Sequence, residues 1–304
     1  MGKLNKLLGI AMIIIGVIIF AFFIKKIGVS DFLEIIKNIN FLWILIALFL
    51  WIIHLLLVVY RFKSFMGIKK ELSYYHVFKT YLQGFLLNYA SAIQGIGIGA
   101  KIVLFKAHDI PVSKTSSSLT LEIIYDLAFS ALFSLVFILF FRKSFLSYFD
   151  SSIKSIVIIL IVLAAIIFIY VLLKKKLTFL KEYFSHIKEH LIHKRNFTKA
   201  TWLTIASWII VLLVNFFVVM ALGEIINPFI ILGGLTIGMI IGMISFIPGG
   251  LGVREGVYGY VYSLSGVALN ITLASAIVSR IISVGSVLLL LIIFEIVEKI
   301  KKLS

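Results

Sequence analysis

Long runs of apolar residues without charges recur along this chain. Each run covers about 20 positions, which at about 1.5 Å of helical rise per residue crosses a hydrocarbon core of about 30 Å. The pattern therefore predicts an all-α fold, a polytopic membrane helix bundle with about six spanning helices. The predicted spans are residues 7–24, 41–60, 116–141, 153–173, 200–222 and 270–296.

The first run has a second interpretation, because Lys3 and Lys6 precede it as basic residues do in a signal peptide. Its apolar stretch is longer than the core of most signal peptides, and Lys25 and Lys26 follow it without a small-residue cleavage site. We therefore expect a membrane span here.

Two further apolar stretches are broken by glycine where a spanning helix would continue. The first, residues 81–106, contains Gly-Ile-Gly-Ile-Gly at 95–99, and the second, residues 227–262, contains Pro-Gly-Gly-Leu-Gly at 248–252. The segment after each break is short for a second full crossing. We interpret both stretches as re-entrant helical hairpins.

The composition agrees with a chain surrounded by lipid. Hydrophobic residues make up 62% of the 304 positions, and the mean hydropathy is +1.16, which is more apolar than a water-facing globule of this length. Cysteine is absent, which excludes disulfides, thiolate nucleophiles and cysteine-ligated metals. No cofactor or metal site is suggested by the remaining residues.

The net charge of +16 is distributed in a way that predicts topology rather than nucleic-acid binding, because the basic residues flank the apolar runs. We assign the basic loops near 61–79, beginning with Arg61, and 174–199 to the cytoplasm. The segments 221–228 and 263–272 carry almost no charge and belong outside. The expected location is the cell membrane, with both termini cytoplasmic.

These assignments make the first hairpin enter from the cytoplasm and the second from outside. The order span, span, hairpin, span then occurs twice with opposite orientation, as in transporters built from inverted repeats. We expect a single integral membrane domain over 1–304, with repeat one at about 1–145 and repeat two at about 150–300.

The connecting segments also carry a pattern, since apolar residues recur at helical spacing in 32–39 and 180–191. We interpret both as amphipathic helices on the membrane surface. The second contains His186, Glu189 and His190 at the spacing of one class of zinc peptidases. Because they fall on a polar helix face, we interpret them as solvated side chains. His54 is expected to be a packed or hydrogen-bonded histidine within a span.

Few ionisable residues lie inside the predicted membrane region, where they are costly and call for a functional hypothesis. Their signs suggest a buried contact, or a polar cavity, where the two repeats meet. A purely structural role, in which the charges lock the halves together, is the alternative. The residues are Glu122, Asp126, Arg254, Glu255 and Arg280.

The second glycine break has two interpretations as well. Pro248, Gly249, Gly250 and Gly252 end one helix and allow close packing. A helix that starts after Gly252 also points its N–H groups and positive dipole end into the membrane, where a phosphate or carboxylate binds favourably beside Arg254.

The segment Ile-Pro-Gly-Gly-Leu-Gly-Val-Arg-Glu at 247–255, followed by Val-Ser-Arg-Ile at 278–281, resembles the flippase-like family named for the lysylphosphatidylglycerol synthase transmembrane region. The resemblance implies a membrane domain that stands alone or is joined to a lipid-modifying partner, and that moves aminoacylated phospholipid across the membrane. The first half departs from the family pattern, because Gln94 and glycines replace a proline, arginine and Gly-Glu motif, and Ile123 replaces an arginine.

We therefore expect a flippase-like protein without a covalent step. In this hypothesis Arg254 and Arg280 bind an anionic headgroup, while Glu122, Asp126 and Glu255 balance or relay charge. The partners are membrane lipids with anionic headgroups, and a separate lipid-modifying enzyme. The alternative is a scaffold that presents lipid to a lipid synthase or glycosyltransferase without transporting it; an integral enzyme is disfavoured because no nucleophile or metal constellation is evident.

Overall fold

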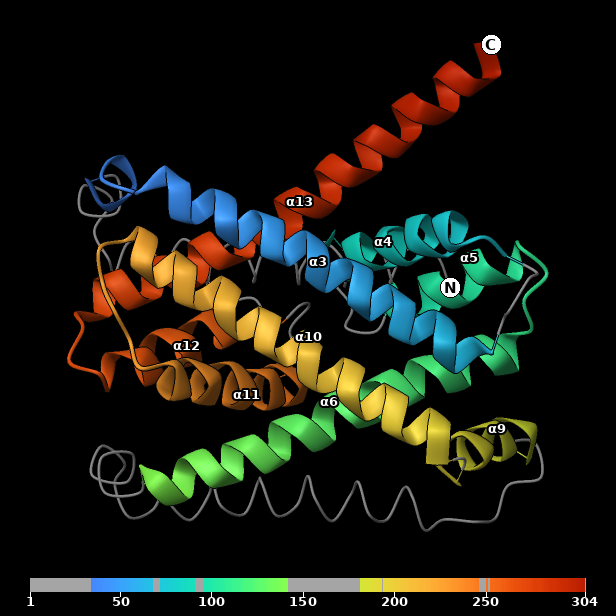
Figure 1. The fold of residues 1–304 in the computed structure, drawn as a ribbon, viewed down its shortest axis with the longest axis horizontal. Coiled ribbons are helices and arrows are strands. Elements are labelled where there is room, and N and C mark those ends of the chain that lie inside the picture. Colours follow the sequence, from blue (N-terminus) through green and yellow to red (C-terminus); the bar gives the residue numbers. More distant parts are fainter. Residues whose placement is uncertain are drawn as a thin grey trace, which may run out of the picture.

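The computed structural model describes residues 34–67, 72–90, 96–141, 181–192, 194–245, 250 and 252–303. These residues form long helices separated by pairs of short ones (Figure 1). In chain order the helices are α3 (Phe41–Met66), α4 (Tyr74–Ala90), α5 (Ile96–Lys106), α6 (Val112–Phe140), α9 (Lys181–Ile192), α10 (Lys194–Ala221), α11 (Pro228–Ile244), α12 (Val253–Ser263) and α13 (Leu269–Leu303).

Four described helices are long and apolar enough to cross a membrane: α3, α6, α10 and α13. Only 22% to 39% of the most apolar stretch of each helix is buried inside the protein, so apolar surface remains on each helix for contact with lipid. The prediction of an all-α membrane helix bundle is confirmed. Two predicted spans, 7–24 and 153–173, lie outside the described residues.

Local sequence signals explain where several helices begin and end. The side chain of Asn40 accepts a hydrogen bond from the N–H of Leu42 at the start of α3, and Gly67 ends that helix with a φ of 63°. Asn227 caps α11 in the same way, with Pro228 at the first helical position. Helix α3 continues six residues past the predicted end of its span, because basic residues near a helix end are compatible with both helix and interface.

The two glycine-broken stretches form pairs of short helices. Helices α4 and α11 each have 17 residues, while α5 and α12 each have 11. Eleven residues span only about 16 Å, so neither α5 nor α12 crosses a hydrocarbon core of about 30 Å. The first pair begins at Tyr74, seven residues before the predicted start of its hairpin at 81.

Helices α3 and α10 run side by side across the middle of the molecule and pack along each other (Figure 1). The backbone N–H of Asn40 donates to the carbonyl of Ala221, so the start of α3 lies beside the end of α10 and the helices are antiparallel. Helix α11 packs on α6, and α4 packs on α13. Each short-helix pair thus contacts the last long helix of the other half of the chain.

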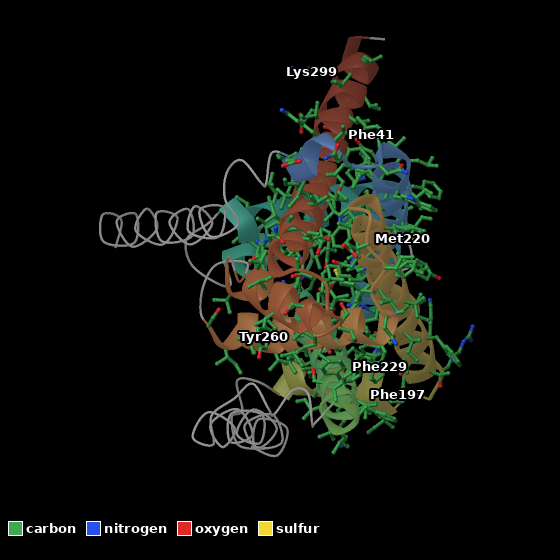
Figure 2. The ribbon with its side chains drawn as sticks, turned by 90° about the vertical axis from the view of Figure 1, so that its left-hand side faces the viewer. Phe41, Phe197, Met220, Phe229, Tyr260 and Lys299 are labelled. Carbon is green, nitrogen blue, oxygen red and sulfur yellow. The ribbon has the colours of Figure 1, made fainter. Side chains whose placement is uncertain are left out.

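The end of α13 extends beyond the other helices, and Lys299 lies on this extension (Figure 2). Lys79 of α4 holds the base of the extension through ion pairs to Glu295, at 2.9 Å, and Glu298, at 2.7 Å. Lys79 was predicted to lie in a loop, and this prediction is wrong because α4 begins before it.

Helix α9 confirms a helix in the segment predicted to be amphipathic, but one side-chain assignment is wrong. His190 was expected to be solvated, whereas it is only 5% exposed and packs edge-on against Phe65, with ring centroids 4.9 Å apart. Ile187, one turn earlier, is also buried in this cluster, while Glu189 is exposed. The inward face of α9 therefore packs on α3, α6 and α10, so His190 and Glu189 do not share one solvated face; the side chain of His186 lies outside the described residues.

Candidate functional site

A cavity of about 270 Å³ lies where both halves of the chain meet. It is called the central cavity below, and its walls come from α3, α4, α6, α10, α11, α12 and α13. Three arginines and three carboxylates line it among aromatic and aliphatic side chains. These charged residues are Arg61, Glu122, Asp126, Arg254, Glu255 and Arg280.

All five ionisable residues singled out in the sequence therefore lie around one cavity. Of the two arrangements considered, a buried contact and a polar cavity, the structure contains a polar cavity with ion pairs in its walls. Each of the three ion pairs described in these walls joins residues of the same half: Arg61 pairs with Asp126 and Glu122, and Arg280 pairs with Glu255.

Arg61 is the principal residue that sequence reasoning misplaced. It was assigned to a cytoplasmic loop, but it lies in α3 and is only 1% exposed. Its Nη1 and Nη2 each donate to one carboxylate oxygen of Asp126 at 2.8 Å, and Nη1 also donates to Thr204 Oγ1 at 2.8 Å. The bidentate pair ties α3 to α6, and the hydrogen bond to Thr204 ties α3 to α10. The signal that pointed elsewhere was Lys63, because two basic residues after an apolar run resemble a positive-inside boundary.

Glu122 lies one helical turn before Asp126 on α6 and is 8% exposed. One of its carboxylate oxygens is 3.7 Å from Arg61 Nη2, and the same oxygen accepts a hydrogen bond from the hydroxyl of Tyr81. Tyr81, from α4, connects the first short-helix pair to the carboxylates. These two partners compensate the charge of the buried carboxylate, which would otherwise be costly in an apolar region.

Glu255 has two functions at the start of α12. One carboxylate oxygen pairs with Arg280 Nε on α13, and the other accepts a hydrogen bond from the N–H of Gly252 at 2.7 Å. The sequence suggested that the N–H groups of this helix start would be open to a ligand. The structure corrects this for Gly252, whose N–H is satisfied by the chain's own carboxylate.

The backbone at the second glycine break requires glycine at two described positions. Gly250 has a φ of 65° and Gly252 a φ of 77°, which other residues adopt only with strain. Pro248 and Gly249 lie outside the described residues. The side chain of Arg254 follows this turn and lies against Gly242 and Gly250, at both of which a Cβ atom would overlap its stem.

Uncharged polar groups complete the walls of the central cavity. His54 Nδ1 lies 3.0 Å from Ser207 Oγ, and the His54 ring packs on Trp51, which confirms a packed and hydrogen-bonded histidine. Ser279 donates to Asn215 Oδ1 at 2.9 Å. The buried indole N–H of Trp51 finds no hydrogen-bond acceptor within the described part of the chain. It is a donor available to a molecule that enters the cavity.

Two comparisons with known proteins bear on this arrangement. The family model described as "Lysylphosphatidylglycerol synthase TM region" matches residues 7–291, nearly the whole chain. No curated protein matches the chain.

Proposed function

We propose that this chain, which belongs to the lysylphosphatidylglycerol synthase TM region family, binds an anionic or aminoacylated lipid headgroup in its central cavity and moves that lipid between the leaflets. The observation that carries the proposal is the central cavity itself. It holds six charged side chains between helices whose outer surfaces are apolar. Ionisable groups in such a position mark substrate paths more often than they add stability.

The charges suit a headgroup that contains both signs. Arg254 and Arg280 line the cavity beside Asp126, whose side chain is 21% exposed. An anionic phosphate is attracted by the arginines, and the amine of an aminoacyl group by the carboxylates. In this proposal Arg61 positions Asp126 through its bidentate hydrogen bonds, and Glu255 positions Arg280.

The opposite orientation of the two halves supports a transport mechanism. Because α3 and α10 are antiparallel, the hairpins that follow them enter from opposite faces. The hairpins also match in detail. Gly84 and Gly238 are each the eleventh residue of their helix, and each faces the sixth residue of the next helix, Lys101 or Tyr258.

A second contact joins the same two helix positions in both hairpins. The larger residue lies on the first helix in one hairpin and on the second helix in the other. Gly97 of α5 packs on Asn88, whereas Arg254, at the same position of α12, packs on Gly242. Four pairs of residues in equivalent positions favour an inverted repeat with repeat one at about 1–145 and repeat two at about 150–300. Two related halves around one site provide the alternating access that a flippase requires.

We propose further that the protein lies in the cell membrane with both termini in the cytoplasm. It acts on lipid without a covalent step. Membrane lipids are then the partners, and a separately encoded lipid-modifying enzyme supplies or uses the lipid.

Reconstitution in liposomes tests the function. Fluorescent anionic and aminoacylated lipids are placed in the inner leaflet, and their exposure to an outside quencher is followed for wild type, Arg254→Ala and Arg280→Ala. We expect both substitutions to reduce the rate at least tenfold, while Arg195→Ala on the exposed start of α10 leaves it unchanged. Equal rates for all four proteins would exclude the site. Binding of the lipids without movement would favour a scaffold that presents lipid.

A further inference from the structure

A second cavity, of about 210 Å³, lies between the two short-helix pairs. It is called the hairpin cavity below. Lys101 of α5 and Arg254 of α12 line it, together with Asn88 and small or apolar residues. No described residue that lines it is a carboxylate, whereas three carboxylates line the central cavity. The two cavities thus differ in electrostatic character although Arg254 lines both.

Lys101 is buried, with 9% of its surface exposed, in a region where a lysine is costly. Its Nζ lies 3.4 Å from the centre of the Tyr81 ring, a cation–π contact. Within the described part of the chain, no carboxylate lies within ion-pair distance of this ammonium group. A ring face compensates less of the desolvation of a cation than an anion does.

The packing holds both cations in place before any ligand arrives. A Cβ atom on Gly84 would overlap the stem of Lys101, and Cβ atoms on Gly242 and Gly250 would overlap the stem of Arg254. Glycine at these positions therefore lets both side chains lie flat against a helix or turn. Ordered cations lose little conformational freedom when an anion binds.

We infer that the hairpin cavity binds a phosphate group, with Lys101 as a point charge and Arg254 as a hydrogen-bonding fork. The cavity is smaller than the roughly 300–1,000 Å³ of sites for drug-sized ligands, so it suits one such group and not an acyl chain. Asn88 supplies a neutral donor. The group is a lipid phosphodiester or free phosphate; the lipid alternative rests on the proposed function and places the rest of the headgroup in the central cavity.

Calorimetry on the full-length protein in maltoside detergent tests this inference. The probes are dihexanoylphosphatidylglycerol, inorganic phosphate, and dihexanoylglycerol, which has the same acyl chains without phosphate. We expect Lys101→Gln to weaken the binding of both phosphate-bearing probes by about tenfold. The affinity for dihexanoylglycerol should not change. Lys106→Gln is the matched control, since Lys106 lies on the same helix and is exposed. Lys101→Arg should retain binding within about threefold because the charge is kept.

The two sources of phosphate give different patterns. Binding of both phosphate-bearing probes, in competition, indicates a site for the phosphate group alone; binding of phosphatidylglycerol only indicates a lipid site. Equal affinities for wild type, Lys101→Gln and Lys106→Gln would overturn the inference, as would a wild type that binds neither phosphate-bearing probe.

A second measurement uses the unmutated chain in case Lys101→Gln does not fold. In protein labelled with ¹³C at lysine Cε, the Lys101 signal, identified with Lys101→Arg, should shift on addition of the bound probe, while the Lys106 signal stays. An unshifted Lys101 signal contradicts the site. Lipid movement that depends on Arg280 with binding indifferent to Lys101 would reject this inference and leave the proposed function standing. Binding that depends on Lys101, in a protein that does not move lipid, would support this inference and reject the proposed function.

Discussion

Arg61 donates two hydrogen bonds of 2.8 Å to Asp126, although 65 positions separate the two residues in the chain. The pair joins α3 to α6 in the wall of the central cavity, and Thr204 extends it to α10. Removing one member of a buried ion pair leaves the other charge uncompensated in the interior. This loss of stability is larger than the stability that the intact pair contributes.

Arg61→Ala should reduce the free energy of unfolding by about 3–5 kcal/mol, because Asp126 and Glu122 then face each other without a cation. The melting temperature of purified protein in detergent measures this loss. Arg61→Ala with Asp126→Ala should recover part of it, since the double variant removes both charges. Arg195→Ala, at an exposed position on α10, should change stability by less than about 0.5 kcal/mol. An Arg61→Ala variant as stable as this control would show that the pair is not needed for folding.

Tyr81→Phe removes the hydroxyl that donates to the buried carboxylate of Glu122 and should cost about 1–3 kcal/mol. Tyr75→Phe is the matched control, because Tyr75 lies on the same helix and donates to Glu298 at 3.1 Å in a more exposed place. The control should cost about 1 kcal/mol or less. Equal thermal stability of the two variants would argue against a buried hydrogen bond at Tyr81.

Two substitutions of Glu255 distinguish its ion pair with Arg280 from its hydrogen bond to the Gly252 N–H. Glu255→Gln retains an acceptor for the Gly252 N–H but leaves Arg280 without its carboxylate, so lipid movement in liposomes should fall while α12 stays capped. Glu255→Ala also removes the cap and should be less stable than Glu255→Gln by about 1 kcal/mol. If both variants show the same melting temperature, the hydrogen bond to Gly252 does not stabilise the start of α12.

Three glycines in the short-helix pairs give a direct test of close packing. Gly84→Ala and Gly238→Ala place a methyl group against Lys101 and Tyr258, so each should destabilise the protein by about 1–3 kcal/mol. Gly99→Ala is the control, because in the described part of the chain the added Cβ meets no atom of another element within 4 Å. It should be neutral or stabilise α5 by up to about 1 kcal/mol. Chemical or thermal unfolding compares the three, and a stabilised Gly84→Ala would contradict the packing.

The opposite entry of the two hairpins is testable by labelling, because the chain contains no cysteine. Ser73→Cys, just before α4, and Ala268→Cys, just before α13, both lie at exposed positions. A membrane-impermeant maleimide should reach Ser73→Cys from the cytoplasmic side and Ala268→Cys from outside. Labelling of both from one side would reject the inverted repeat.

Much of the fold was predictable because membrane helices are encoded by local patterns. Runs of about 20 apolar residues predicted the described spans, and the glycine breaks predicted the two pairs of short helices. Ionisable residues in apolar surroundings identified five of the six charged side chains around the central cavity, since such residues are rare and costly in a membrane.

The tertiary structure alone decided which charges are partners. Arg61 lies beside Lys63 in the sequence, and local pattern gives both the same topological role, yet the packing of α3 against α6 buries only Arg61. The burial of His190 against Phe65 depends likewise on a contact between separate segments. Hydropathy and spacing report the environment of a residue along its own helix. Ion pairs and cavities instead depend on how helices distant in the chain approach one another, which a local pattern does not encode.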